Sequence, residues 1–403
     1  MNLTTLSASY LRARPLNTVL SLVLLALGVA TIVLLILVVS QLEERMHRDA
    51  RGIDLVVGAK GSPMQLILSG IYHVDAPTGN IPLSSVDLLS KNRMVKRAIP
   101  LALGDSWKGH RIVGAPHAYP EHYGAALAGG RLWEKPMDVV LGADVAARTG
   151  MGVGGRFTGV HGIGSEGGGE EHADAPYTVV GVLQKTSSVL DRMVLTGIES
   201  VWQVHEAEHG PEDEADRKAL EEAREVTVVL IQYASPLAAA TLPRQINAQS
   251  ELQAASPAYE TARLFSIVGV GVEALRAFAL VLILAAGLSV FIALYNALEE
   301  RRYDLAVMRT LGASRGKLFG LLLTEGVVLS LLGALLGLAL GHALASALGA
   351  WLSAQQHYPV TGAEWRPEEL WVVAVALGVG VLAALLPAWR AYRTEVSRTL
   401  AQA

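Results

Sequence analysis

Long apolar runs divide the chain into segments that can enter a lipid bilayer and segments that cannot. The first run extends from Leu16 to Ser40 and contains no charged residue. Three further runs lie in the last third of the chain, at about residues 274–298, 318–348 and 370–388. A helix needs about 20 apolar residues to cross the hydrocarbon core, because its backbone polar groups must be satisfied within the segment. The pattern therefore predicts four transmembrane helices.

The first run lies near the N-terminus, where a secretory signal peptide would also lie. Its apolar stretch is longer than the core of a signal peptide, which has about 7–15 residues, and no small-residue cleavage site follows it. We therefore expect residues 1–41 to form a short N-terminal segment and an uncleaved first span.

Residues 42–265, between the first two spans, are too many for a loop. Four β-branched apolar runs bounded by glycine or proline recur there, as is typical of strands. They are residues 53–57, 139–141, 177–183 and 226–233. Mixed with polar stretches of helical character, they predict a mixed α/β domain.

Two polar stretches lie between the expected strands. Pro211 to Glu225 is strongly charged with helical spacing, and Glu214 and Lys218 stand four residues apart, so we expect a solvated helix. Gly159 to Ala175 contains three consecutive glycines and several acids, which predicts a mobile hairpin or loop.

Basic residues beside the apolar runs predict the orientation, since short segments rich in Lys and Arg stay in the cytoplasm. Three groups fall on one side if the chain crosses four times: Arg12 and Arg14; Arg301, Arg302, Arg309, Arg315 and Lys317; and Arg390, Arg393 and Arg398. We expect a multi-pass protein of the inner membrane with both termini and the loop 299–317 in the cytoplasm. Residues 42–265 and the loop 349–369 then lie on the outer, periplasmic side.

Composition narrows the class of protein. With 51% hydrophobic and 17% charged residues, the chain is too apolar for an ordinary soluble enzyme of its length. Its net charge of -4 and the lack of a long basic stripe give no sign of nucleic-acid binding. The absence of cysteine excludes disulfides, thiolate chemistry and cysteine-ligated zinc.

Catalytic and nucleotide-binding motifs are missing from the sequence. It contains no G-x-x-x-x-G-K-[ST] loop, and the glycine-rich stretch at 152–155 lacks the lysine that would hold a phosphate. Neither a G-x-S-x-G nor an H-E-x-x-H motif is present. We therefore expect no enzyme activity and no cofactor in this chain, so any ATP-driven step requires another polypeptide.

Histidines in the outer segment raise the question of metal binding. His205 and His209 stand four residues apart, and His161 and His172 lie among acidic residues. Two histidines on one helical face can hold a divalent metal ion. Solvated surface histidines of a polar domain are the more frequent alternative.

The third span contains several small residues and one acidic residue, Glu325. Its glycines and alanines, at 333–337 and 341–343, predict close helix packing rather than a pore lining. Glu325 lies about two turns into the span. Ionisable residues inside spans are usually functional or interfacial, so Glu325 is expected to face the helix bundle and to bind an arginine or a backbone donor. A packing role alone is the alternative.

The loop after the second span carries the most specific motif. Residues 299–314 read EERRYDLAVMRTLGAS. The stretch resembles the R-x-x-E-[IL]-A-[VL]-x-[RK]-[AT]-[LI]-G-A signature of FtsX-like permeases, the family that includes MacB and LolC/LolE, with Asp304 where the family usually has Glu. Residues 386–391 likewise resemble the family's closing P-A-x-R-A motif.

Parts of the outer segment are similar to the MacB-type periplasmic core. They are residues 139–147, 152–155 and 177–183, with Asp191 and Arg192 soon after. The resemblance covers nearly the whole chain and assigns residues 266–403 to an FtsX-like permease domain.

The resemblance implies a permease subunit of an ABC transporter that works by mechanotransmission. A separate cytoplasmic ATPase, present in two copies, would bind ATP and Mg and move the outer domain. A short amphipathic helix in the loop would sit in a groove of that ATPase. The coupling residues implied are Arg301, Arg302, Tyr303, Asp304, Leu305, Val307, Met308, Arg309, Leu311, Gly312, Ser314 and Arg315. A second permease chain, identical or homologous, completes the complex.

Several alternatives stay open at this point. A regulatory scaffold like FtsX itself would activate a periplasmic partner, although the large outer segment is a poor match to the small insert of that branch. A receptor without an ATPase and a metal-linked transporter that uses the outer histidines are further alternatives. No residue selects the substrate, and a periplasmic adaptor or substrate-binding protein is neither required nor excluded.

Overall fold

A computed structural model describes residues 15–162, 175–206, 223–300, 307–356 and 360–393 of the chain. The chain divides into two compact units. Residues 44–266 form one, called the outer unit below, and residues 1–43 together with 267–403 form the other, called the membrane unit. The division falls inside two of the long helices.

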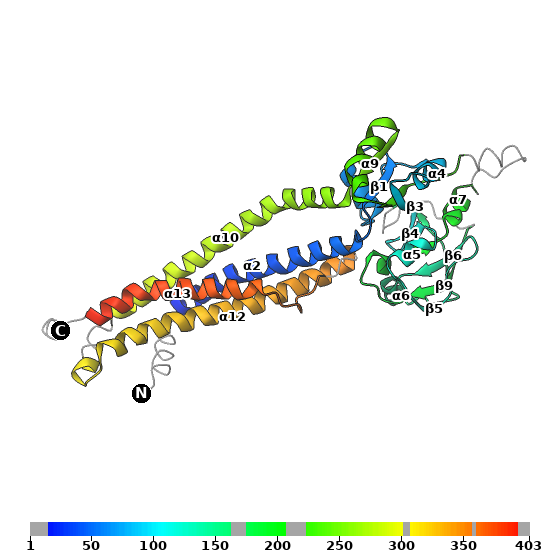
Figure 1. Cartoon of the computed structure of the whole chain (residues 1–403). Helices are drawn as coiled ribbons and strands as arrows, with labels where there is room; N and C mark the ends of the chain where they lie inside the picture. Colours follow the sequence, from blue (N-terminus) through cyan, green and yellow to red (C-terminus); the bar gives the residue numbers. More distant parts are fainter. Residues whose placement is uncertain (1–14, 163–174, 207–222, 301–306, 357–359, 394–403) are drawn as a thin grey trace, which may run out of the picture. The chain divides into compact units, whose positions relative to one another are not determined.

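The membrane unit contains four helices that are long and apolar enough to cross a bilayer, within the part of the chain that is described. They are α2 (Pro15–Asp49), α10 (Pro257–Glu300), α12 (Arg315–Gln356) and α13 (Glu368–Arg393) (Figure 1). The four predicted spans are therefore confirmed. Three of the helices extend well beyond the spans, and α10 begins at Pro257, where proline suits the first position of a helix because its missing N–H needs no partner there.

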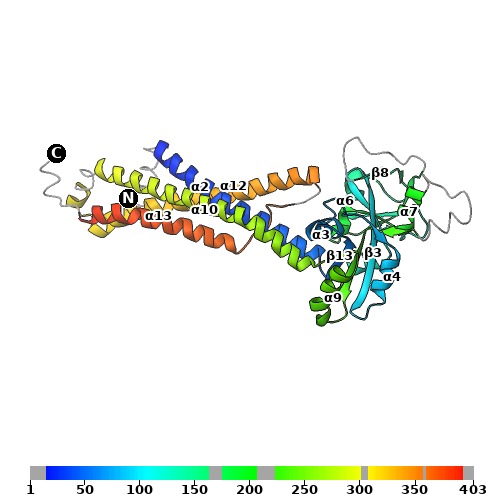
Figure 2. The same ribbon diagram turned by 90° about the horizontal axis from the view of Figure 1, so that it is seen from above.

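Apolar side chains from all four helices form the core of the membrane unit. One cluster joins Leu25, Val29, Val33 and Leu37 of α2 to Ile283 of α10, Leu338 of α12 and Val372 of α13. A second cluster lies where α10, α12 and α13 meet, and it contains Leu294, Leu298, Leu318, Leu322 and Ala384. Helices α12 and α13 run side by side in both views (Figures 1 and 2).

Glycines on α12 allow α2 to pack closely. Spaced one turn apart, they contact apolar side chains of α2 in the pairs Gly333 with Leu25, Gly337 with Val29 and Gly341 with Val33. A Cβ atom at Gly337 would lie 2.6 Å from Val29 Cβ and 2.8 Å from the carbonyl oxygen of Ala26. The small residues therefore serve helix packing, as their spacing predicts.

The outer unit is built on one large mixed sheet, in the strand order β13-β1-β12-β3-β4-β10-β6-β9-β5, with β8 paired to β3 and β7 to β9. The strands are β1 (Leu55–Ala59), β3 (Val95–Trp107), β4 (His110–Gly114), β5 (Leu127–Gly130), β6 (Asp138–Leu141), β7 (Arg156–Phe157), β8 (Val160–His161), β9 (Tyr177–Leu183), β10 (Val194–Thr196), β12 (Val228–Tyr233) and β13 (Leu252–Ala255). A small second sheet pairs β2 (Ile81–Pro82) with β11 (Glu225–Val226).

Short helices cover the sheet. They are α3 (Pro63–Gly70), α4 (Ser84–Ser90), α5 (Ala118–His122), α6 (Ala143–Thr149), the 3-10 helix η1 (Val189–Arg192), α7 (Ile198–Glu206) and α9 (Pro236–Gln249). Helix α6 ends at Gly150, whose φ of +67° closes the helix in the left-handed region.

The large sheet and the helices that cover it confirm the predicted mixed α/β domain between the first and second spans.

Strand β3 joins the two halves of the large sheet (Figure 2). Its first part pairs with β12 and its second part with β4, and the register shifts between Leu103 and Ser106. The hydroxyl of Thr227 accepts a 2.9 Å bond from the Leu103 N–H at this junction. Separate apolar cores form on the two sides, one around Leu55, Val57, Val229 and Leu242 and the other around Ile112, Leu141, Tyr177 and Val194.

The strand predictions hold with local changes. Strand β9 spans the predicted residues 177–183, while the run 226–233 divides at Thr227 into β11 and β12. Glu225, expected at the end of a charged helix, instead begins β11, so that end of the prediction is wrong. Most of the predicted helix and of the loop 159–175 lies outside the described residues.

The glycine seam between α2 and α12 can be tested by overpacking. We expect Gly337→Val to destabilise the membrane unit by about 1–3 kcal/mol, because the new methyl groups meet α2. Thermal unfolding of the full chain in detergent measures this effect. The matched control is Gly378→Val on α13, where an added Cβ has no atom within 4 Å among the described residues. Equal unfolding temperatures for the two variants would contradict the packing argument.

Candidate functional site

Residues 307–314, the described part of the segment between α10 and α12, contain a turn with a left-handed glycine. Residues 307–310 are helical. The Ala313 N–H donates to the Met308 carbonyl at 2.9 Å, and the Gly312 N–H donates to the Arg309 carbonyl at 3.1 Å. Gly312 has a φ of +99°, which side chains with a Cβ rarely adopt. These two bonds form a Schellman motif, so the glycine of the family signature is required by the backbone.

Ser314 directly precedes α12 and caps its first turn. Its hydroxyl accepts from the Lys317 N–H at 3.3 Å, and its carbonyl accepts from the same N–H at 3.1 Å. Serine at this position satisfies one of the N–H groups that a helix start leaves unpaired. The turn from Met308 to Ser314 is therefore fixed at both ends by its own backbone.

Met308 and Leu311, two apolar residues that the family resemblance assigns to coupling, differ in burial. Met308 packs against the cluster that contains Leu298, Leu318 and Leu322. Leu311, in contrast, is 82% exposed. Leu311 is therefore an exposed apolar side chain of this turn, while Met308 packs the turn against the helices.

The structure describes only some of the other residues to which the family resemblance assigns a coupling role. Arg301, Arg302, Tyr303, Asp304 and Leu305 lie outside the described residues. Val307 and Arg309 belong to the helical turn, and Arg315 is the first residue of α12. Their roles in coupling stay predictions.

Glu325 is buried in the membrane unit, with 2% of its surface exposed. It lies next to Gly326, where a Cβ atom would come within 2.6 Å of Ala384 on α13. The expected inward orientation is thus observed, while a functional role for this carboxyl group stays a prediction.

A buried polar cluster that the sequence did not reveal lies where α12 meets the start of α13. His342 Nε2 lies 3.0 Å from the Glu369 carboxyl group, and His342 Nδ1 lies 2.6 Å from the Gly362 carbonyl oxygen. The other carboxyl oxygen of Glu369 accepts from the Arg366 N–H at 3.0 Å. Glu369 is 2% exposed. Both nitrogens of His342 therefore face oxygen atoms, one of the Gly362 carbonyl group and one of the Glu369 carboxyl group.

The loop before α13 is also hydrogen-bonded to α2. Gln41 donates to the Thr361 carbonyl at 2.7 Å and accepts from the Thr361 N–H at 2.9 Å. A Cβ atom at Gly362 would collide with the His342 carbonyl oxygen, so only glycine lets the loop come this close. In the sequence, His342 stands out as a histidine among small residues of a span. Its partner Glu369 lies 27 residues further along the chain and could not be found from residue spacing.

Two substitutions of Glu369 distinguish the effect of its negative charge from the effect of its size and hydrogen bonds. We expect Glu369→Ala to lower stability by about 3 kcal/mol, because it removes one partner of a buried pair. Glu369→Gln should cost about 1 kcal/mol or less, because its amide can donate to His342 and accept from Arg366. Thermal unfolding in detergent compares the two. A glutamine variant as unstable as the alanine variant would show that the negative charge itself is required.

A second buried polar cluster lies in the outer unit around His73. Its Nε2 lies 3.1 Å from the Tyr119 hydroxyl, and its buried Nδ1 has no hydrogen-bond partner within the described part of the chain. Arg111 donates to the Asp75 carbonyl at 2.9 Å, and burial lowers its pKa to about 10. Burial, together with the charges of Arg111 and Arg192, lowers the pKa of His73 well below its usual value.

This shift predicts how the stability of the outer unit depends on pH. Below about pH 6.5 the unfolded state binds a proton at His73 that the folded state does not bind, so the free energy of unfolding falls as the pH falls. The contribution of His73 to the change in unfolding free energy with pH approaches about 1.4 kcal/mol per pH unit. We expect His73→Asn to reduce the slope, and asparagine suits the φ of +54° at this position. Denaturant unfolding of the full chain at several pH values measures it, and an unchanged slope would contradict the assignment.

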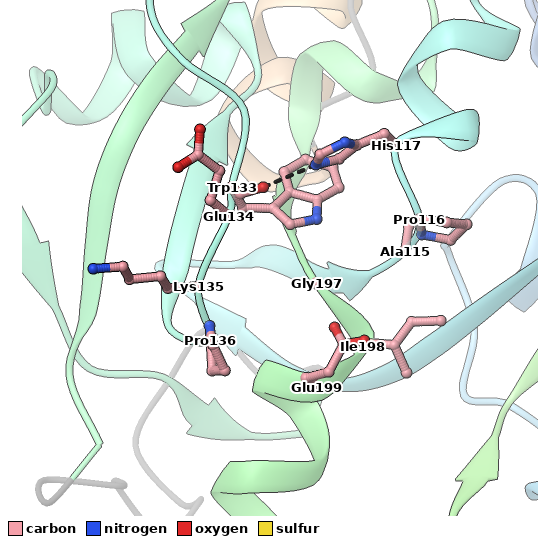
Figure 3. Close-up of a pocket in the computed structure, with 10 residues that line it drawn as sticks. All are labelled: Ala115, Pro116, His117, Trp133, Glu134, Lys135, Pro136, Gly197, Ile198 and Glu199. Carbon is pink, nitrogen blue, oxygen red and sulfur yellow. Dashed lines mark hydrogen bonds between the residues drawn. The ribbon is translucent and has the colours of Figure 1, made fainter.

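An open cleft of about 550 Å³ lies at the carboxyl ends of the parallel strands β4 and β10 (Figure 3). Trp133 is buried beside it, and His117 Nε2 bonds the Trp133 carbonyl oxygen at 2.8 Å. Glu134, Lys135 and Glu199 line the cleft with charges of both signs. Ligands often bind at such strand ends, but mixed charges in an open cleft select no single class of ligand.

The histidines considered for metal binding are placed only in part. His161 belongs to β8 and His205 to α7, and their side chains lie outside the described set, as do His172 and His209 altogether. Among the described residues, no group of three or more His, Asp or Glu side chains could hold a metal ion. Metal binding by these four residues stays a prediction.

The features above define a class of protein: a multi-pass membrane protein with a large extracytoplasmic α/β domain between its first two spans. The MacB-like periplasmic core domain family matches residues 18–249, and the FtsX-like permease C-terminal family matches residues 276–396. The first match alone covers more than half of the chain. The chain therefore belongs to the MacB/FtsX-type family of ABC transporter permeases, which are non-catalytic transmembrane subunits.

Two solved structures show a distant likeness to this chain. The periplasmic region of MacB from Actinobacillus actinomycetemcomitans is 13% identical, with a TM-score of 0.34, and the match covers 54% of this chain and 97% of that one. The extracellular domain of the ABC-type transporter YknZ from Gram-positive bacteria is 13% identical, with a TM-score of 0.29, over 50% of this chain and 98% of that one. Comparison with curated proteins gave no match.

Proposed function

We propose that this permease converts ATP hydrolysis by a separate cytoplasmic ATPase into movement of its outer unit. The observation that carries the proposal is the turn between α10 and α12, which holds Leu311 82% exposed at the position of the family's coupling motif. An exposed leucine on a turn that its own hydrogen bonds fix suits a binding groove on a partner, because little conformational entropy is lost on docking.

Continuous helices supply the mechanical link. Helix α10 runs from Pro257, in the outer unit, to Glu300, beside the coupling turn. At 1.5 Å per residue, its 44 residues span about 66 Å. Helix α2 likewise contributes residues to both units. Displacement of the end of α10 at Glu300 can therefore reach the outer unit along the hydrogen-bonded backbone of this helix.

The proposed complex contains two permease chains and two ATPase subunits, and ATP and Mg are bound by the ATPase. The basic residues beside the spans support a cytoplasmic position for the coupling turn and both termini. Work is then done on a substrate at the outer face of the inner membrane, for its export or extraction. The match to the large MacB-like core favours this function over that of a regulatory scaffold.

Leu311 is the residue whose change tests coupling most directly. We expect Leu311→Asp to reduce stimulation of the partner ATPase at least about tenfold, because a carboxylate replaces an apolar contact worth about 1.5–3 kcal/mol. ATPase activity of the reconstituted complex, measured against the ATPase concentration, gives the change in affinity.

Leu237→Asp is the matched control, since Leu237 lies on α9 in the outer unit and is 69% exposed. It should leave ATPase stimulation unchanged. Both variants should insert into the membrane to the same extent as the parent chain. Normal assembly and stimulation with Leu311→Asp would refute the proposed contact.

A further inference from the structure

An apolar groove of about 620 Å³ lies between the beginning of α12 and the end of α13. Its lining residues are Gly316 and Phe319 of α12 and Leu382, Leu385, Leu386, Trp389 and Tyr392 of α13. The five residues of α13 are spaced three or four apart, apart from the adjacent pair 385–386, so they form one stripe along the helix. Within the described part of the chain, these lining residues carry no charge.

Gly316, the second residue of α12, contributes no side chain to the groove. A Cβ atom at Gly316 would have no other atom within 4 Å among the described residues. The stripe on α13 is correspondingly exposed, with Leu382 68%, Leu386 53% and Trp389 52% accessible. In a helix that spans the membrane, such a surface contacts lipid chains or another apolar partner.

One end of the groove carries two positive charges. The Arg315 guanidinium lies over the Tyr392 ring, 6.0 Å from its centre, and the Arg393 guanidinium lies over the Trp389 ring at 5.2 Å. Both rings line the groove. Tryptophan and tyrosine favour the level of the lipid head groups, so the charges stand where head groups lie and the leucines stand at the depth of the acyl chains.

We propose that the groove binds an anionic phospholipid. One acyl chain lies along Leu382, Leu385, Leu386 and Phe319, and the anionic head group lies between Arg315 and Arg393. Basic sites between helix ends attract anionic head groups, whereas the choline group of a zwitterionic lipid would face two positive charges. The proposal requires only that the helices span the membrane, and it is independent of the ATPase.

Arg390 provides a matched control on the same helix turn. Its guanidinium donates to the Tyr295 hydroxyl of α10 and lies 4.8 Å from the centre of that ring. The same charge is therefore directed to α10 and not to the groove. Arg390→Gln removes one positive charge at this depth and leaves both arginines of the groove.

Fluorescence quenching by brominated lipids tests the proposal. The purified full chain, without ATPase, is placed in phosphatidylcholine vesicles that contain the same fraction of either brominated phosphatidylglycerol or brominated phosphatidylcholine. The Trp389 signal is the difference between the chain and its Trp389→Phe variant. We expect phosphatidylglycerol to quench Trp389 about threefold more than phosphatidylcholine, because two arginines favour the anionic head group.

Charge variants decide between a specific site and ordinary boundary lipid. The double variant Arg315→Gln, Arg393→Gln should quench equally with both lipids, while Arg390→Gln and the double Arg→Lys variant should keep most of the preference. Equal quenching of the parent chain by both lipids would refute the proposal. Failure of either lipid to quench Trp389 would also refute it, since a second copy of the chain would then cover the groove.

Discussion

Backbone hydrogen bonding in lipid is the constraint on which this structure depends. No water is available in the hydrocarbon core, so each span must be an unbroken helix. In this chain, α2 and α10 do not stop at the membrane boundary and contribute residues to the outer unit as well. Two of the spans thus continue as unbroken helices from the membrane unit into the outer unit. The proposed mechanical coupling needs such continuity.

Close helix contact in lipid comes from small residues and from buried polar groups with partners. Gly333, Gly337 and Gly341 bring α12 against α2 because they have no side chain. His342 and Glu369 work differently, because a carboxyl group with 2% exposure is tolerated only where nearby donors compensate for its lost hydration. The first device sets how closely the helices approach, and the second fixes the loop before α13.

The two ends of the membrane unit therefore differ in chemistry. At the α12–α13 loop, polar groups bond inward, and Gln41 and Thr361 hold the loop to α2. At the opposite ends of these helices, Leu311, Trp389 and the arginines Arg315 and Arg393 are exposed. A surface of exposed leucine, tryptophan and arginine suits partners, whether an ATPase groove or a lipid head group. In the proposed function, force from the ATPase enters at the end that carries Leu311.

The sequence by itself determined the four spans, the α/β domain between the first two, strand β9 and the family motif, because hydropathy, residue alternation and motif spacing are local properties. Tertiary structure alone decided that Met308 packs inward while Leu311 is exposed, that His342 meets Glu369, and that β3 joins two half-sheets. These features depend on which distant side chains come into contact, and a helical or strand period does not carry that information. For Gly312 both sources were needed. The sequence motif identified the position, and the φ of +99° in the structure explains why it requires glycine.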